Sequence, residues 1–362
     1  QIAGPVDGAR LFSGETYAYG NTDIKMNKND YYLNVNYQRV LDKLSLKSGI
    51  SVDSRNQGIT GQFPVYDYAI DVGHPGFSYE KRRQVDLPEA YLYGKYKWNE
   101  HWISGLGIRR KFGSRMHASY NSGQLNLKYN PLREHSINFA LGRYHHLALP
   151  HAEIHSKTLY MSDQVALDYQ YENERLDISA AIFAKETTHH ETREEIFGME
   201  TFGRVYLLQN RFSFQASYTM IIATGISDGL TYPTRYNMDY YVRASAKYQT
   251  SGNLDISLIM LYRQGTYYRP VRGADFVPSL NVYEPKYASR VDKTRLPNYL
   301  KLDLSVSKLW PLSPDLGVVI FLNISNILNT DNVQTKTYNH DYSESLNRLY
   351  SKRTIYFGGM VY

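Results

Sequence analysis

Residues 299–307 read Tyr299-Leu300-Lys301-Leu302-Asp303-Leu304-Ser305-Val306-Ser307, and every second side chain from Leu300 to Val306 is apolar. A period of two marks a β-strand with one apolar and one polar face. This stretch lies in an alternating segment, Pro297–Trp310, and a second one, Leu316–Leu328, follows it. At about 11 to 14 residues, both segments exceed the five or six residues of a typical soluble strand and match tilted strands that cross a bilayer.

Strand-like patterns recur along the whole chain, and short connections alternate with mostly longer ones. We expect sixteen strands, at residues 10–20, 31–41, 43–55, 88–99, 101–113, 120–130, 135–146, 159–171, 174–187, 197–209, 211–224, 236–249, 253–267, 297–310, 315–328 and 352–362. Outer-membrane β-barrels have short periplasmic turns and long extracellular loops. We therefore predict an all-β fold, a transmembrane antiparallel β-barrel over residues 1–362. Its extracellular loops are expected at about 57–86, 146–158, 187–195, 225–235, 266–295 and 330–350.

The composition agrees with a barrel and argues against several other classes. No run approaches the 18 apolar residues of a membrane-spanning helix, and there is no cysteine to form a disulfide or a thiolate metal site. The net charge is +6, but Lys and Arg are spread over many segments, so we expect lipopolysaccharide rather than nucleic acid as a partner. No local signature selects a nucleophile and a base, so we expect no enzyme.

Aromatic residues mark the expected membrane boundary. Tyrosine occurs 35 times, and the three tryptophans, Trp98, Trp102 and Trp310, fall beside predicted short turns. Tryptophan prefers the headgroup level, where its ring is half buried and its N–H stays hydrated. We predict that these three residues and the terminal Tyr362 are anchors at the membrane interface.

The last third of the chain resembles the C-terminal strands of TonB-dependent outer-membrane receptors. The residues that carry the resemblance are Arg295-Leu296-Pro297-Asn298-Tyr299-Leu300-Lys301-Leu302-Asp303-Leu304-Ser305 and Leu322-Asn323-Ile324-Ser325-Asn326-Ile327-Leu328-Asn329. Upstream, Phe139–His146 and Ser162–Tyr169 are similar to the same family. The resemblance runs over most of residues 30–362. It implies a bacterial outer-membrane location and the uptake of a scarce nutrient: a siderophore, metal complex, oligosaccharide or peptide.

Family members usually have 22 strands and an N-terminal plug domain that contacts TonB, and neither a plug nor 22 strands is seen in this sequence. We therefore expect this chain to be part of a 22-strand barrel that reaches TonB through a plug domain not seen here. A plugless porin-like channel and a structural barrel in a larger complex are the alternatives. The expected partners are outer-membrane lipid, a small-molecule or oligomeric nutrient, and a surface lipoprotein over the loops, with no resident cofactor.

Two sets of loop residues are candidates for ligand binding. Histidines from neighbouring loops could hold a metal or a metal complex: His145, His146, His151, His155, His189 and His190. In loop 266–295, aromatic side chains next to arginines suit sugars, catecholates or peptides, and the arginine pair suits an anion: Tyr267, Tyr268, Arg269 and Arg272. Exposed loop residues and loop packing are the alternative explanations for both sets.

Overall fold

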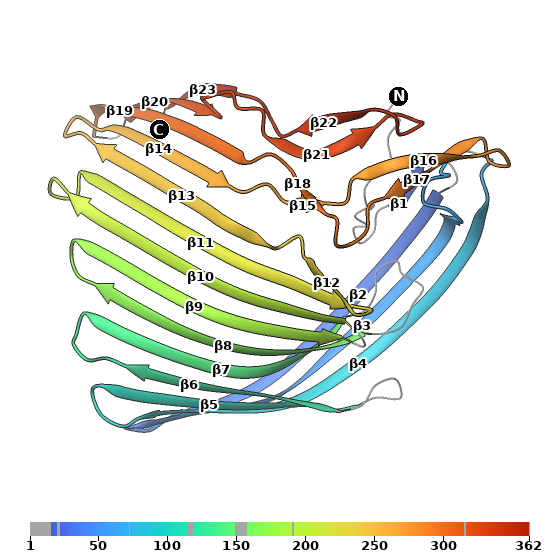
Figure 1. Ribbon diagram of the computed structural model, residues 1–362. Coiled ribbons are helices and arrows are strands. Elements are labelled where there is room, and N and C mark those ends of the chain that lie inside the picture. The colour runs from blue at the N-terminus through green and yellow to red at the C-terminus, as the bar shows by residue number, and fades with distance from the viewer. Residues whose placement is uncertain are drawn as a thin grey trace.

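The computed structural model describes residues 16–19, 22–71, 73–113, 119–148, 158–189, 192–314 and 316–361. Within them, seventeen strands form one large sheet that curls round like a barrel wall (Figure 1). These strands are β1 (Thr16–Tyr19), β2 (Thr22–Val40), β3 (Leu44–Pro64), β4 (Gly76–Lys97), β5 (Trp102–Lys111), β6 (Tyr120–Tyr129), β7 (His135–Ala148), β8 (Thr158–Glu172), β9 (Leu176–His189), β10 (Thr192–Leu207), β11 (Phe212–Ser227), β12 (Leu230–Pro233), β13 (Met238–Gln249), β14 (Leu254–Arg263), β19 (Tyr299–Ser313), β20 (Leu316–Ser325) and β23 (Thr354–Val361). The predicted all-β class is confirmed. No helix in the described ranges is long and apolar enough to cross a bilayer.

Three two-stranded sheets lie in the connections at one end of the large sheet. They are β15 (Tyr267–Tyr268) with β18 (Thr294–Arg295), β16 (Val271–Val277) with β17 (Val282–Tyr287), and β21 (Val333–Tyr338) with β22 (Ser345–Leu349). The first two follow β14 and precede β19, and the third lies between β20 and β23. Figure 1 shows that the tight turns gather at the opposite end of the sheet.

The alternation of short and long connections predicted from the sequence is confirmed. Residues 41–43 alone join β2 to β3, and residues 250–253 alone join β13 to β14. In the second of these turns Asn253 has a φ of 57°, a left-handed conformation that asparagine tolerates better than most residues. The short turns all lie at one end, and most connections at the other end are longer; β9 and β10, which only residues 190–191 separate, are an exception.

The period-two pattern places apolar side chains on the outer face of the sheet. Leu258, Leu304, Ile324 and Ile355 are direct cross-strand partners over four neighbouring strands. Partners of this kind share one face of a sheet, and Ile355 is exposed there. The neighbouring row contains Ser257, Ser305 and Asn323 and lies on the opposite face.

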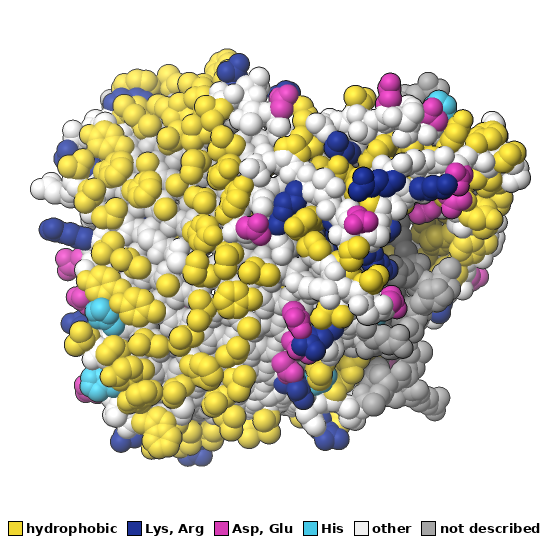
Figure 2. Space-filling model, viewed as in Figure 1, with side chains coloured by type: hydrophobic (Ala, Val, Ile, Leu, Met, Phe, Trp, Pro, Cys, Tyr) yellow, Lys and Arg dark blue, Asp and Glu magenta, His cyan; other side chains and the backbone are white. Residues whose placement is uncertain are grey.

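A row of charged residues ends the apolar face on β7 to β10. Arg143, Asp163, Glu186 and Glu195 are cross-strand partners, and two residues closer to the short turns the same face carries Leu141, Val165, Ala184 and Phe197. Arg143 forms an ion pair with Asp163 at 2.6 Å, and Arg193 forms one with Glu186 at 2.7 Å. Figure 2 shows hydrophobic side chains over the half of this face next to the short turns and charged side chains beyond it.

Apart from the short strand β1, the outermost strands of the sheet are β2 and β23, and they run in the same direction. Every pair of neighbouring strands is antiparallel, and β2 is separated from β23 by an even number of such steps through β3 to β11, β13, β14, β19 and β20. Within the described residues, the outer edge of β2 pairs only with β1, at Thr22–Lys25, and β23 pairs only with β20. Leu33 and Phe357 on these strands expose 67% and 78% of their surface. An all-antiparallel closure between these edges therefore needs an odd number of intervening strands.

Several predicted loops are shorter than expected because the strands continue beyond the apolar band. The strands β3 and β4 pair from Leu44↔Tyr96 to Pro64↔Gly76, so the connection expected at 57–86 contains only residues 65–75. Likewise β9 and β10 occupy most of the loop expected at 187–195. Backbone hydrogen bonds extend these ladders where the side chains no longer alternate, and alternation was the only signal that the sequence offered.

Other predicted boundaries shift as well. The strands β7 and β8 reach into the expected loop 146–158, β12 lies within 225–235, and the three two-stranded sheets lie within 266–295 and 330–350. Of the strand predicted at 10–20, the structure describes only β1. The strands predicted at 31–41 and 88–99 are longer, because β2 and β4 extend well beyond the apolar segments toward the long connections.

All three tryptophans lie beside the short turns, as predicted. Trp98 directly follows β4 and donates from Nε1 to Ser104 Oγ at 2.9 Å. The ring of Trp102, at the start of β5, stacks on Tyr129 with 4.3 Å between centroids. Trp310 lies near the end of β19 and is exposed. Their role as interface anchors stays a prediction, and Tyr362 lies outside the described residues.

Candidate ligand-binding site at the long-connection end

Connections from distant parts of the chain meet at the end of the sheet opposite the short turns. The Nε2 atom of His74, in the connection between β3 and β4, lies 2.9 Å from the carbonyl oxygen of Leu280, between β16 and β17. The backbone N–H of Val271 donates to Tyr338 Oη on β21 at 3.2 Å. The rings of Tyr283 and His340 lie 6.0 Å apart. Three connections, 65–75, 264–298 and 326–353, therefore support one another.

The connection between β14 and β19 is held at its base by Arg295. Its guanidinium donates to Asn237 Oδ1 at 2.7 Å and to the carbonyl oxygen of Gly265 at 3.2 Å, and forms an ion pair with Asp239 at 3.2 Å. It also lies 3.9 Å from the centroid of the Tyr267 ring. With these partners Arg295 and Tyr267 have a structural role.

A close backbone approach sets the shape of this base. A Cβ atom added at Gly265 would lie 1.7 Å from the carbonyl oxygen of Leu296. No side chain fits at that distance, so the two ends of the connection can meet only where glycine stands. The pairing of β15 with β18 begins directly beyond this contact.

Above this base, Arg269, Arg290 and Lys293 gather around two tyrosine rings. Lys293 Nζ lies 4.7 Å from the centroid of Tyr232, and the Arg290 guanidinium lies 5.9 Å from the same centroid. The Arg269 guanidinium lies 5.6 Å from the centroid of Tyr287. We call Arg269, Arg290 and Lys293 the basic cluster.

Hydrogen bonds to the backbone orient two members of the basic cluster. Arg269 donates from Nε to the carbonyl oxygen of Ala288 at 2.9 Å, and Lys293 donates from Nζ to the carbonyl oxygen of Pro233 at 2.7 Å. Burial and the positive charges of Arg269 and Arg290 together lower the pKa of Lys293 from its ordinary value. Within the described residues, no carboxylate forms an ion pair with any of the three cations.

The structure brings together only some of the predicted aromatic and basic residues. Arg269 lies in the basic cluster, whereas Tyr267 lies under Arg295 and Tyr268 is in β15 opposite Thr294. Arg272 is exposed on β16, away from these contacts. Three residues of the site, Arg290, Lys293 and Tyr232, were not predicted from the sequence. The density of basic residues in 288–295 was a signal for the first two, but nothing local pointed to Tyr232.

The predicted histidine site is only partly within the described residues. The ring of His189 stacks on Tyr160 at 4.7 Å, and Tyr160 is the cross-strand partner of His146. His145 lies 5.2 Å from the Tyr120 ring, on the β6 side. His151, His155 and His190 lie outside the described residues. No group of three or more metal-ligating side chains occurs in the part of the chain that the structure describes.

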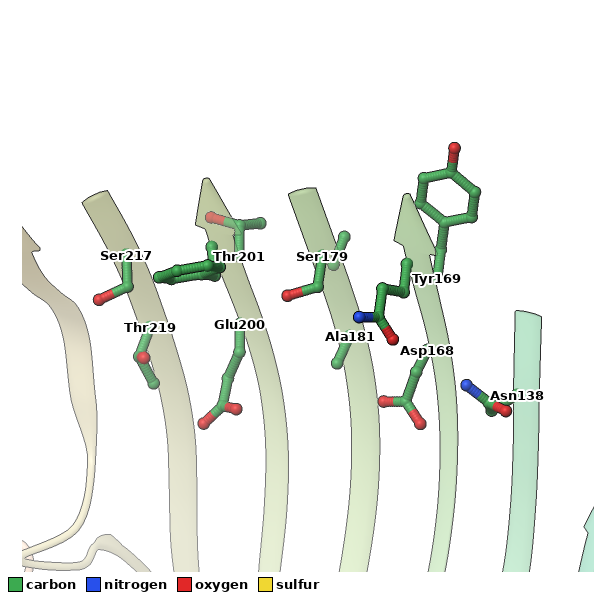
Figure 3. A pocket seen from close by; sticks show the side chains of 12 residues that line it. Asn138, Asp168, Tyr169, Ser179, Ala181, Glu200, Thr201, Ser217 and Thr219 are labelled. Carbon is green, nitrogen blue, oxygen red and sulfur yellow. The ribbon is translucent and has the colours of Figure 1, made fainter. Parts of the chain in front are cut away.

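A second feature, a polar hollow of about 400 Å³, lies on the opposite face of β7 to β11 from the apolar row (Figure 3). Asn138, Asp168, Ala181, Glu200 and Thr219 form one cross-strand row along it. Asp168 and Glu200 point the same way from β8 and β10, and the small side chain of Ala181 between them leaves the space open. Neither carboxylate has an ion-pair partner among the described residues.

The fold is similar to that of TonB-dependent outer-membrane receptors of known structure, so the resemblance seen in the sequence is confirmed at the level of the fold. The ferric citrate transporter FecA in its unliganded form superposes with a TM-score of 0.67 at 14% identity, over 96% of this chain and 57% of that one. The ferric yersiniabactin uptake receptor FyuA from Yersinia pestis gives 0.68 at 14% identity, over 96% and 56%. The copper transporter OprC gives 0.63 at 11% identity, over 94% and 57%.

The chain thus spans a little over half the length of these receptors. No model of a protein family matches the sequence. No curated protein matches it either.

Proposed function

We propose that this chain forms most of the membrane-spanning wall of a TonB-dependent transporter in a bacterial outer membrane, which imports a scarce nutrient. The observation that carries the proposal is the two-faced wall. Its outer face is apolar up to the charged row at Arg143 and Asp163, and its opposite face carries the polar hollow. Lipid requires apolar side chains and fully paired backbone groups, which a closed antiparallel barrel supplies.

The orientation follows from the connections. Short turns in outer-membrane barrels face the periplasm, so the basic cluster and the meeting connections would face the cell exterior. Trp98, Trp102 and Trp310 would then anchor the periplasmic boundary. A nutrient would be captured at the outer end and would pass along the polar inner wall.

Among the described residues, the edge of β2 beyond Lys25 and the outer edge of β23 have no partner strand, which supports a wall that is completed by further strands. Backbone groups exposed to lipid have no water to bond with, and each costs several kcal/mol. A plug domain in the completed barrel would pack against the inner wall, where Asp168 and Glu200 offer partners for its cationic side chains. Such a plug would connect the barrel to TonB. A surface lipoprotein over the loops remains a proposal of the same kind.

A plugless porin-like channel is the alternative, because the polar inner wall would also suit an open aqueous pore. Single-channel conductance of the natural protein in planar bilayers separates the two. A plugged transporter should be nearly silent, whereas a large steady conductance would contradict our proposal. Nutrient uptake by cells that carry the natural protein should also stop when TonB is deleted, and uptake that continues without TonB would count equally against it.

A further inference from the structure

We infer that Arg269, Arg290 and Lys293 form a binding site for a small soluble polyanion, a molecule with two or more carboxylate or phosphate groups. The inference rests on the proposed function, capture of a nutrient at the outer end, and it names the chemical class of that nutrient. The site combines two segments far apart in the sequence. The three cations come from residues 269–293, and Tyr232 comes from the hairpin of β11 and β12.

The basic cluster carries three positive charges without an ion-pair partner in the part of the chain that the structure describes. Three cations lie around two tyrosine rings, and no carboxylate among the described residues neutralises them. Like charges repel one another, and the partial burial of Lys293 weakens the screening by water at its ammonium group, whereas Arg269 and Arg290 are exposed. The lowered pKa of Lys293 has both causes, burial first and then the charges of Arg269 and Arg290. An anion bound near the three groups would offset the repulsion between their charges.

The side chains of the basic cluster retain N–H donors that a ligand can use. Arg269 uses Nε for the carbonyl oxygen of Ala288, so its two terminal nitrogens remain. Lys293 uses one of its three N–H groups for Pro233. Arg290 is exposed and donates to no described residue. Charge-assisted hydrogen bonds from such donors to carboxylate or phosphate are stronger than neutral ones.

The tyrosine rings of the site are less suited to sugars, catecholates or cationic ligands. A sugar or catecholate would stack on an open tyrosine face, and a cationic ligand would need the same faces. The cations of the cluster already lie over those rings, at 4.7 Å for Lys293 on Tyr232 and 5.6 Å for Arg269 on Tyr287. A cation therefore already occupies one face of each tyrosine ring, and the charged groups are the partners that the cluster offers to a ligand.

Isothermal titration of the natural protein in detergent tests the inference, with citrate and pyrophosphate as soluble probes and maltotriose as a neutral one. We expect at least one of the two anions to bind with one-to-one stoichiometry, and maltotriose not to bind. Replacing Arg290 or Lys293 with glutamine should weaken that binding about ten-fold each, since every change removes a charge-assisted hydrogen bond. Arg348→Gln, on the exposed strand β22, is the matched control and should leave the affinity unchanged.

Four outcomes would overturn the inference. They are no binding of either anion, binding that survives both cluster substitutions, equal weakening by Arg348→Gln, and cluster-dependent binding of lipopolysaccharide micelles without binding of the soluble anions. The last would assign the cluster to a lipid phosphate. A difference in gel migration between heated and unheated samples, equal to that of the unsubstituted protein, verifies that each variant is folded. Failure here would leave the transporter proposal intact, because conductance and TonB dependence test that proposal without these residues.

Discussion

Replacing Asn332 with alanine should loosen the connection between β20 and β23 from the barrel wall. Asn332 is only 2% exposed, and its side chain bonds both backbone groups of Leu300 at the start of β19. Leu300 N–H donates to Asn332 Oδ1 at 2.8 Å, and Asn332 Nδ2 donates to the Leu300 carbonyl oxygen at 2.8 Å. Leu300 pairs with β14 on one side, and the Asn332 side chain takes the place of a strand on the other side, where the pairing with β20 begins only at Leu304.

The magnitude follows from the two groups that the substitution leaves without partners. A buried backbone donor or acceptor that loses its partner costs about 1–3 kcal/mol. Leu300 is half buried, and water can partly replace the lost bonds. We therefore expect the free energy of unfolding to fall by about 2–4 kcal/mol for Asn332→Ala, near the lower end of the sum of two such costs.

Equilibrium unfolding in urea, with the protein in detergent micelles, measures this loss. Protease cleavage within residues 333–349 should also accelerate, because the freed connection opens locally. Asn347→Ala is the control, since Asn347 is exposed on β22 and its substitution should change the unfolding free energy by less than about 0.5 kcal/mol. A loss for Asn332→Ala no greater than that of the control would refute the reasoning.

Three further predictions follow from the same structure. Gly265→Ala should displace the base of connection 264–298, because the new Cβ would lie 1.7 Å from the Leu296 carbonyl oxygen, and slower refolding with lost anion binding would show it. A protein with the two substitutions Val35→Cys and Phe357→Cys should form no internal disulfide, because β2 and β23 run in the same direction and an antiparallel closure would place at least one strand between them. The control is a cysteine pair on β20 and β23, which are hydrogen-bonded to each other. If the first disulfide formed as readily as the control, the edges of β2 and β23 would be in contact. As the pH rises, anion affinity should begin to fall at a pH below the range in which an ordinary lysine loses its proton, because the pKa of Lys293 is lowered. Lys293→Met should abolish that decline. An unchanged pH profile in this variant would assign the decline to another group.

The receptor-like motifs near the end of the chain have a physical explanation in the structure. Asp303 Oδ1 accepts hydrogen bonds from the backbone N–H of Asn326 at 2.8 Å and from Ser325 Oγ at 3.1 Å. Asn326 is 1% exposed and has a φ of 53°, so it ends β20 with a left-handed residue. Asn326 Oδ1 then accepts from the N–H of Thr330. The two motifs thus meet and fasten the end of β20 to the neighbouring strand.

The sequence predicted most of the wall because its pattern is local. A strand with lipid on one face and polar groups on the other repeats every two residues, whatever its neighbours are. The alternation around Leu304 therefore located β19, and the short turns gave the strand order. The same reasoning ended too early at residues 57–86. There Ile59, Phe63 and Tyr79 pack on one face of β3 and β4, but charged and polar residues interrupt the alternation along each strand.

The sequence by itself therefore determined the all-β class, the direction of the strands and the face that each side chain occupies. Tertiary structure alone decided which loop residues meet. Arg269 and Arg272 lie three residues apart, yet only Arg269 joins Arg290 and Lys293, because the β16–β17 hairpin brings Ala288 back to Arg269, whose Nε donates to the Ala288 carbonyl oxygen. Tyr232 on β12 is about sixty residues earlier in the chain, and its contact with Lys293 forms because the Lys293 ammonium group donates to the carbonyl oxygen of the next residue, Pro233. Beyond the apolar band no periodic constraint relates one loop to another, so only the packed connections bring three cations together.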